Sequence, residues 1–235
     1  QDLQRMMKSS LRGNFIRTQR FKKWQTQSME QNSARWKMKM IEWIVWRHER
    51  ILIVIKLSYV NIDENGVVDL NHLKELLQNN PRTFVSIMHA NNEIGTIQDI
   101  KAIGDICKEH KAIFHSDTVQ TMAHFSFDMQ EINIDFMAAS AHKFHGPKGV
   151  GFVYISDDIK IKPLLRGGGQ ERNMRAGTEN IYGIAALAKA MEMAYENMEE
   201  ETTYIKGLKK YMIEKLQSEI EDVQFYGKCT DLDDS

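Results

Sequence analysis

The stretch Ser140-Ala141-His142-Lys143 decides the fold prediction, together with Asp117 in the upstream stretch His115-Ser116-Asp117-Thr118-Val119-Gln120. Both stretches come at the end of short apolar runs, at 134–138 and 112–115, of the length that buried strands have. Polar side chains directly after parallel strands gather at the carboxyl edge of the sheet, where α/β proteins bind ligands. The sequence therefore predicts an α/β fold with a binding site at this edge.

Strand-like and helix-like segments alternate around these two stretches. Strands are predicted at 84–88, 112–115, 134–138 and 150–155, and helices are predicted to follow Asp69 and Asp99, which can cap helix N-termini. Because each strand run is continuously apolar, the pattern favours a mostly parallel sheet covered by helices on both faces. A long helical pattern covers 181–220 with a break expected near 202–207, and 223–226 is predicted to open another strand.

The N-terminal part differs from the rest of the chain in charge. Residues 1–50 contain 12 Lys/Arg and 4 Asp/Glu, the remainder contains 19 and 28, and all four tryptophans lie between positions 24 and 46. A basic, aromatic arm can bind nucleic acid, but these residues form no stripe or motif, so we predict no nucleic-acid binding. We predict three parts: a segment outside the main fold at 1–58, a large domain at 59–200, and the start of a truncated small domain at 201–235.

Composition and spacing exclude several other classes of protein. No run approaches the roughly 18 apolar residues that a membrane span needs, and the first 25 residues lack the apolar core of a secretion signal. Cys107 and Cys229 are far apart, and the histidines lack the spacing of zinc motifs, so no metal site is predicted. A reducing, cytoplasmic location is the expectation.

The residue types at the predicted sheet edge suit an enzyme that uses pyridoxal 5'-phosphate (PLP). That chemistry needs an amine to bind the aldehyde as a Schiff base and a carboxylate to keep the ring nitrogen protonated. Burial in a pocket would lower the pKa of a lysine from about 10.4 and free its amine. Taken alone, Lys143 is more simply a surface lysine and Asp117 a loop cap. Their combination with Gln120, Ser140 and His142 favours the PLP interpretation.

Four segments carry a resemblance to a known family: 89–95 (HANNEIG), 115–120 (HSDTVQ), 140–143 (SAHK) and 172–178 (RNMRAGT). With these motifs, residues 59 to about 235 strongly resemble the NifS/IscS-type cysteine desulfurases, which are PLP enzymes of the class V aminotransferase family with the fold type I architecture. The resemblance implies a transferase that converts L-cysteine to L-alanine and passes the sulfur on for iron–sulfur cluster and thiocofactor assembly. It also implies a homodimer and a sulfur-acceptor scaffold protein as partner.

The resemblance assigns a role to each motif residue. Lys143 would form the Schiff base and carry the substrate α-proton, and Asp117 would pair with the ring nitrogen. Gln120 would donate to the ring phenolate oxygen. Asn92 would help to position the side of the ring that carries this oxygen, and the substrate beside it. Ser140 and His142 would bind the cofactor phosphate, and Thr178 would reach the phosphate held by the other subunit.

The sequence also departs from the family pattern. The family's Gly-Gly-Thr phosphate segment is absent from 1–58, and the family's C-terminal loop with the nucleophilic cysteine has no counterpart, because Cys229 comes too early. We therefore expect the chain as given to be an incomplete desulfurase. Two alternatives stay open: another class V enzyme, either a selenocysteine lyase or an aminotransferase, and a non-catalytic PLP-fold fragment.

Overall fold

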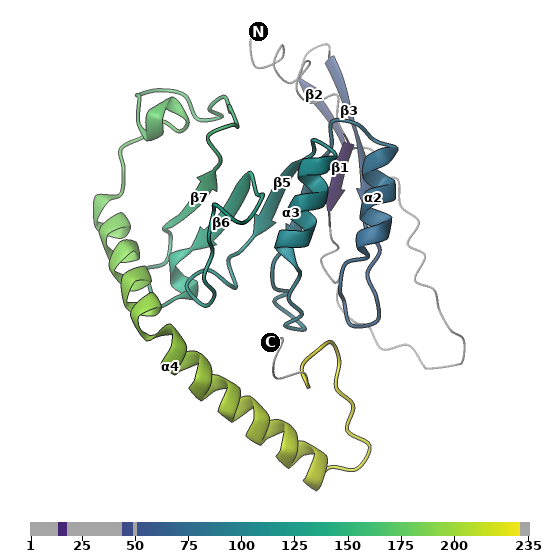
Figure 1. Ribbon diagram of the computed structural model, residues 1–235. Coiled ribbons are helices and arrows are strands. Elements are labelled where there is room, and N and C mark those ends of the chain that lie inside the picture. Colours follow the sequence, from purple (N-terminus) through teal and green to yellow (C-terminus); the bar gives the residue numbers. More distant parts are fainter. Residues whose placement is uncertain (1–13, 18–43, 49–50, 231–235) are drawn as a thin grey trace.

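The computed structural model describes residues 14–17, 44–48 and 51–230, with side chains described from Lys56 onward. A mixed, mostly parallel sheet is its central element, with helices beside it (Figure 1). Within the described ranges, no helix has the length and apolar character needed to cross a membrane. The predicted fold class, a mostly parallel sheet flanked by helices, is confirmed.

Seven strands form the sheet in the order β2-β3-β1-β4-β5-β6-β7. Their bounds are β1 Asn14–Arg17, β2 Ile44–His48, β3 Ile51–Tyr59, β4 Phe84–Met88, β5 Ile113–Asp117, β6 Phe136–Ser140 and β7 Gly151–Ile155. The central pairings from β3 through β6 are parallel, whereas the outer pairs β2–β3 and β6–β7 are antiparallel. The last residues of β4, β5 and β6 therefore lie at one edge of the sheet.

Two capped helices connect the central strands, as the sequence predicts. In α2 (Leu70–Gln78) the Asp69 carboxylate accepts hydrogen bonds from the N–H groups of Asn71 and His72. In α3 (Ile100–Glu109) the Asp99 carboxylate accepts from the Ala102 N–H. Such caps satisfy N–H groups that the first helical turn leaves unpaired, which explains why both boundaries could be predicted locally.

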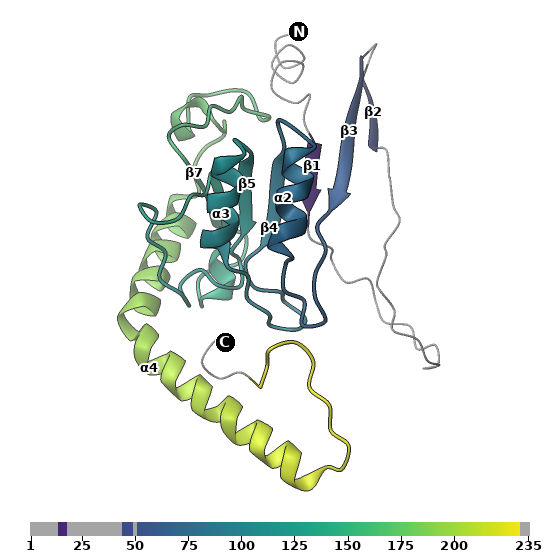
Figure 2. The same ribbon diagram turned by 45° about the vertical axis from the view of Figure 1, so that its right-hand side comes forward.

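Buried and half-buried residues alternate along β4, β5 and β6, so one face of the sheet is more deeply buried than the other. The sequence predicts a sheet covered by helices on both faces. Val85, Ile87, Phe114 and Met137 point to the deeply buried face, and α2 and α3 lie on one face of the sheet (Figure 2). The residues between them along the strands, among them Asp117 and Ser140, are only half-buried. The site residues that end β5 and β6 therefore lie on the less covered face.

The N-terminal segment contributes to the same sheet. β1 pairs in parallel with both β3 and β4, so a strand from residues 14–17 lies inside the sheet. β3 runs across the predicted boundary at residue 58 without interruption. These strands could not be predicted from the sequence, because the segment shows no sustained period of 2.0 or 3.6. The basic arm with Trp24, Trp36 and Trp43 lies outside the described residues.

The long helix α4 spans Ile181–Glu219 as one element, so the predicted break near 202–207 is wrong. The Thr203 hydroxyl donates to the Glu199 carbonyl within the helix (2.8 Å), and Gly207 alone costs a helix only about 1 kcal/mol. The predicted strand at 223–226 is also wrong, because these residues take no regular structure after the helix ends. Figure 1 shows the second half of α4 extending away from the sheet, after which the chain turns back and Gly227 comes to lie beside Ile94 and Thr96.

One close contact between α3 and the loop before β6 gives a testable prediction. A Cβ on Gly104 would meet the Asn133 carbonyl group, whereas a Cβ on Gly207 in α4 would meet nothing within 4 Å. We expect Gly104→Ala to lower the free energy of unfolding by about 2–3 kcal/mol through this overlap. The matched change Gly207→Ala should raise it by about 1 kcal/mol. Urea unfolding of both variants checks the pair, and equal effects would contradict the assigned packing.

Candidate active site at the strand ends

Asp117 ends β5 at the centre of the predicted site. It lies between Met88 at the end of β4 and Ala138 near the end of β6 in the strand register. Its Oδ1 accepts a hydrogen bond from the Val119 N–H (3.0 Å), and its carbonyl accepts one from the His89 N–H (2.9 Å). The carboxylate is thus fixed at the sheet edge, with Oδ2 as its second acceptor.

The other predicted residues of this group follow β6 directly. Ser140 ends the strand, and a short 3₁₀ helix, η1 (Ala141–Lys143), carries His142 and Lys143. The Ser140 hydroxyl and His142 Nδ1 are 2.8 Å apart, so these two predicted phosphate ligands already contact each other. Ala141 is fully buried, and its carbonyl accepts from the Phe144 and Gly146 N–H groups, which holds the turn in place.

Lys143 and His142 are exposed in the described structure, which differs from the desolvated pocket that the sequence argument requires. The backbone around Lys143 is anchored, since its carbonyl lies 3.3 Å from His124 Nε2. Lys143 therefore lies directly after the end of β6, but the described residues alone do not exclude water from its amine, and its role stays a prediction.

Gln120 and Asn92 lie on the loops beside Asp117. Gln120 is half-buried in the turn 118–122, where the Thr118 carbonyl accepts the N–H groups of Thr121 (3.0 Å) and Met122 (2.8 Å). Asn92 is exposed in the loop after β4, and its Nδ2 donates to Glu93 Oε1 at 2.9 Å. Both residues thus follow the ends of neighbouring strands, as the sequence predicts.

Thr178 lies on the loop between η2 (Glu171–Asn173) and α4, where its side chain is exposed. The segment that leads to this loop leaves the sheet at the end of β7, beside Phe136 and at the opposite end of β6 from Ser140. The role of Thr178 at a second subunit stays a prediction.

The sequence analysis gave no role to His89 and Thr121, which the structure joins beside Asp117. His89 Nδ1 lies 2.8 Å from Thr121 Oγ1, and both side chains are buried. The ring of His89 also packs edge-on against Phe125 and Phe127, at centroid distances of 5.7 and 5.4 Å. The position of His89 directly after a predicted strand is the one local feature that could have singled it out.

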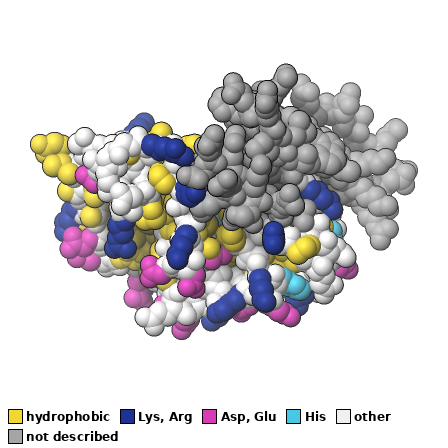
Figure 3. All heavy atoms as spheres, turned by 90° about the horizontal axis from the view of Figure 1, so that it is seen from above, with side chains coloured by type: hydrophobic (Ala, Val, Ile, Leu, Met, Phe, Trp, Pro, Cys, Tyr) yellow, Lys and Arg dark blue, Asp and Glu magenta, His cyan; other side chains and the backbone are white. Residues whose placement is uncertain are grey.

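No group of three or more His, Cys, Asp or Glu residues in the described ranges could hold a metal ion. On the face in Figure 3, Lys and Arg side chains of the described residues are interspersed with Asp and Glu.

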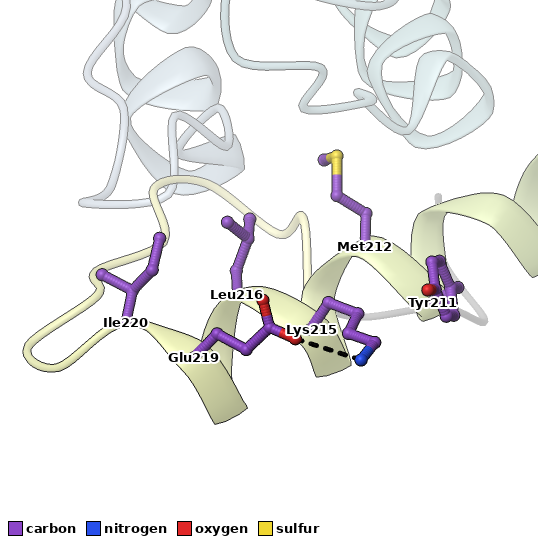
Figure 4. A pocket seen from close by; sticks show the side chains of 6 residues that line it. All are labelled: Tyr211, Met212, Lys215, Leu216, Glu219 and Ile220. Atoms are coloured by element: carbon purple, nitrogen blue, oxygen red, sulfur yellow. Dashed lines mark hydrogen bonds and ion pairs between the residues drawn. The ribbon is translucent and has the colours of Figure 1, made fainter.

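A shallow hollow of about 210 Å³ lies near the C-terminal end of α4, where Met212, Leu216 and Ile220 point the same way and Lys215 pairs with Glu219 (Figure 4). None of the predicted site residues lines this hollow.

The two cysteines differ in reactivity according to their surroundings, which is testable. Burial, with the nearby charge of Asp135 as a smaller cause, raises the pKa of Cys107 to about 12, whereas Cys229 is half-exposed in the C-terminal tail. Since only a thiolate reacts, we expect a thiol-specific disulfide reagent to modify Cys229 at least about 100-fold faster than Cys107. Mass mapping before and after unfolding measures this, and rapid native labelling of Cys107 would contradict it.

Comparison with known proteins assigns the family. The sequence profile described as Aminotransferase class-V matches residues 44–234. The chain belongs to the class V aminotransferase family. The match begins upstream of residue 59, inside the segment that the sequence analysis placed outside the main fold. The boundary at residue 58 stays a prediction.

Relatives of this class V chain confirm the predicted resemblance to NifS/IscS-type enzymes. It is 46% identical over 172 residues to a Clostridium botulinum protein named cysteine desulfurase IscS, and 44% identical to one of the same name from Dictyoglomus turgidum. In both comparisons the match covers 73% of this chain and 43% of the relative. The chain thus spans less than half the length of these curated relatives.

Solved structures agree with this class V assignment. A NifS-like protein from Rickettsia africae superposes with a TM-score of 0.71 at 29% identity, covering 94% of this chain and 57% of that one. A second structure, titled NifS-like protein, has a TM-score of 0.66 at 42% identity, covering 70% and 45%. A structure titled SspA in complex with cysteine has a TM-score of 0.56 at 35% identity, covering 59% and 40%.

Proposed function

We propose that this chain is the cofactor-binding part of a PLP-dependent cysteine desulfurase. The observation that carries the proposal is the meeting of two strand ends. β5 and β6 are adjacent and parallel, so the Asp117 carboxylate lies at the same sheet edge as the turn with Ser140, His142 and Lys143. A carboxylate, a phosphate-binding pair and a primary amine are the groups that this cofactor needs.

The chemistry of these side chains fits the cofactor. The Ser140 hydroxyl and the His142 imidazole lie within hydrogen-bonding distance of each other, and both can donate to phosphate oxygens. Asp117 is held by the Val119 N–H through Oδ1, so its carboxylate is oriented before any ligand arrives. Lys143 follows the phosphate pair directly on η1, and its exposed amine is accessible to an aldehyde.

When bound, PLP acts as an electron sink that stabilises negative charge at the substrate α-carbon. Asp117 would accept the ring N–H and keep that nitrogen protonated, and Gln120 would donate to the phenolate oxygen. Asn92 would help to position the side of the ring that carries this oxygen, and the substrate beside it. The Nζ atom of Lys143 would bind the aldehyde covalently, and once released it would take the substrate α-proton and return it. Apart from the covalent bond of Lys143 to the aldehyde, these roles use only hydrogen bonds and proton transfers that the side chains can make.

The relatives support the choice of substrate. One structural neighbour is titled as a complex with cysteine, and the curated relatives are named cysteine desulfurase. We therefore place L-cysteine as substrate and L-alanine as product, with the sulfur passing to a cysteine thiol as a persulfide and then to an acceptor protein. We also place the chain in a homodimer in which Thr178, exposed on the loop before α4, completes the site of the other chain.

Reduction with borohydride tests the cofactor site directly. The full chain is incubated with PLP, reduced, digested and mapped by mass spectrometry. We expect one pyridoxyl group per chain, at Lys143. Labelling that is absent, or scattered over the surface lysines, would overturn the proposal and leave the non-catalytic fragment as the better description.

A substrate series separates the desulfurase from the other class V reactions. The PLP-loaded chain is mixed with L-cysteine, L-selenocysteine or L-alanine plus a keto acid, and its absorption spectrum and products are followed. A spectral change with L-cysteine supports the desulfurase. A response to selenocysteine alone would favour the lyase, and formation of a new keto acid would favour an aminotransferase.

A further inference from the structure

We propose that His89 and Thr121 form a positioning pair that holds the turn with Asp117 and Gln120 against the loop with Asn92. This inference rests on the proposed function, because these three residues are its predicted cofactor contacts. Neither His89 nor Thr121 is assigned a contact with the cofactor or the substrate. Their effect on the site passes through the turn.

The backbone of His89 ties the end of β4 to two neighbouring segments. Its N–H donates to the Asp117 carbonyl (2.9 Å), and its carbonyl accepts from the Gln98 N–H (2.8 Å). The first bond fixes His89 beside the last residue of β5. The second closes the loop that contains Asn92. His89 is therefore the residue at which the Asn92 loop and the Asp117 strand end meet.

The side chain of His89 extends this connection to the turn after β5. Its Nδ1 atom lies 2.8 Å from Thr121 Oγ1, one residue after Gln120. The start of the same turn is anchored to β6, because Thr118 donates to the Ala138 carbonyl through its N–H (3.1 Å) and its hydroxyl (2.8 Å). The turn is thus held from β4 on one side and from β6 on the other, with Gln120 between the two anchors.

Water cannot easily replace the His89–Thr121 bond. His89 and Thr121 are only 7% and 1% exposed, and Phe125 and Phe127 pack edge-on against the imidazole. Removing the hydroxyl therefore leaves a buried ring nitrogen without its partner. The turn then loses its side-chain bond to His89, while the backbone bond between His89 and Asp117 and the attachment to β6 through Thr118 are retained.

A second histidine–hydroxyl pair in the same two strands provides a matched control. Ser86 Oγ in β4 and His115 Nδ1 in β5 lie 2.9 Å apart, two register positions before the last residues of these strands. Loss of that bond removes a similar interaction between β4 and β5 but leaves the turn at 118–122 anchored on both sides. A merely structural role for His89 predicts similar effects for the two pairs.

The test compares Thr121→Val with Ser86→Ala in the full chain. PLP affinity and the absorption band of the bound cofactor are measured, and amide exchange of Val119 is followed without PLP. We expect Thr121→Val to weaken PLP binding roughly tenfold and to speed Val119 exchange by a similar factor. Ser86→Ala should change either quantity by less than about twofold. Thr121→Ser, which keeps the hydroxyl, should restore wild-type behaviour.

Each outcome decides the inference. Equal effects of Thr121→Val and Ser86→Ala, or no effect of Thr121→Val, would overturn it. Should Thr121→Val fail to fold, Thr121→Ala removes the hydroxyl without adding a methyl group that faces His89, and the same comparison applies. Should the wild-type chain not bind PLP, the proposed function fails, but Val119 exchange still shows whether the pair holds the turn.

Discussion

Replacing Lys143 with alanine is expected to abolish covalent attachment of PLP to the chain. Only the amine that binds the aldehyde within the site should be trapped by borohydride in stoichiometric yield, so labelling should fall below about 1% of the wild-type level. The Ser140–His142 contact does not involve Lys143, so phosphate binding should survive the change. Mass spectrometry of the reduced protein, together with the cofactor absorption band, measures the loss.

Lys148 provides the control for this experiment. It lies in the turn between η1 and β7 and, like Lys143, is exposed. If exposure alone governed labelling, Lys143→Ala and Lys148→Ala would reduce it equally. We expect Lys148→Ala to retain full labelling at Lys143. Wild-type yields in Lys143→Ala, at Lys148 or any other lysine, would show that the strand-end geometry does not select the reactive amine.

Lowering the pH from 6.5 to 4 is expected to destabilise the wild-type chain by about 3 kcal/mol through His89 alone. Burial lowers the pKa of His89 from 6.5 to about 4, against a smaller opposing effect of the Asp99 carboxylate. The unfolded chain therefore binds this proton at a higher pH than the folded chain does. The stabilisation is present above pH 6.5 and is lost as the pH falls toward 4. Burial also lowers the pKa of His115, which should add to the same slope.

Two variants separate the charge of His89 from its hydrogen bond. His89→Phe removes the titrating group, so it should be less stable at pH 7 but should lose about 2–3 kcal/mol less than wild type on going to pH 4. Thr121→Val keeps the imidazole, so its curve should be lower at pH 7 and should keep a slope in the same direction. Urea unfolding across this range measures both. Parallel curves for wild type and His89→Phe would contradict the assigned titration.

Much of the fold could be predicted from local sequence because its elements have local causes. The caps at Asp69 and Asp99 depend on side chains next to the helices they start, and the strands at 84–88 and 151–155 are short apolar runs. The errors have non-local causes. Residues 14–17 form a strand only because β3 and β4 lie on either side of them. Residues 223–226 take no regular structure although they form a short apolar run, so local pattern alone does not decide whether such a run becomes a strand.

The candidate site likewise has features with local causes and features with non-local causes. The sequence by itself determined which chemical groups follow the strands: a carboxylate at Asp117, a hydroxyl and an imidazole at Ser140 and His142, and an amine at Lys143. These follow from residue identity and from the position of each apolar run, which are properties of the chain alone.

Only the tertiary structure decided which strand ends are neighbours and how deeply their side chains lie. The register of β5 with β6 sets Asp117 near Ser140, and the exposure of Lys143 depends on which elements cover that edge. The bond between His89 and Thr121 joins residues 32 positions apart in sequence. Strand pairing and side-chain burial depend on contacts between segments that are distant in sequence. The free energies of these contacts cannot be read from a local sequence pattern, so pairing and burial are decided only when the sheet is assembled.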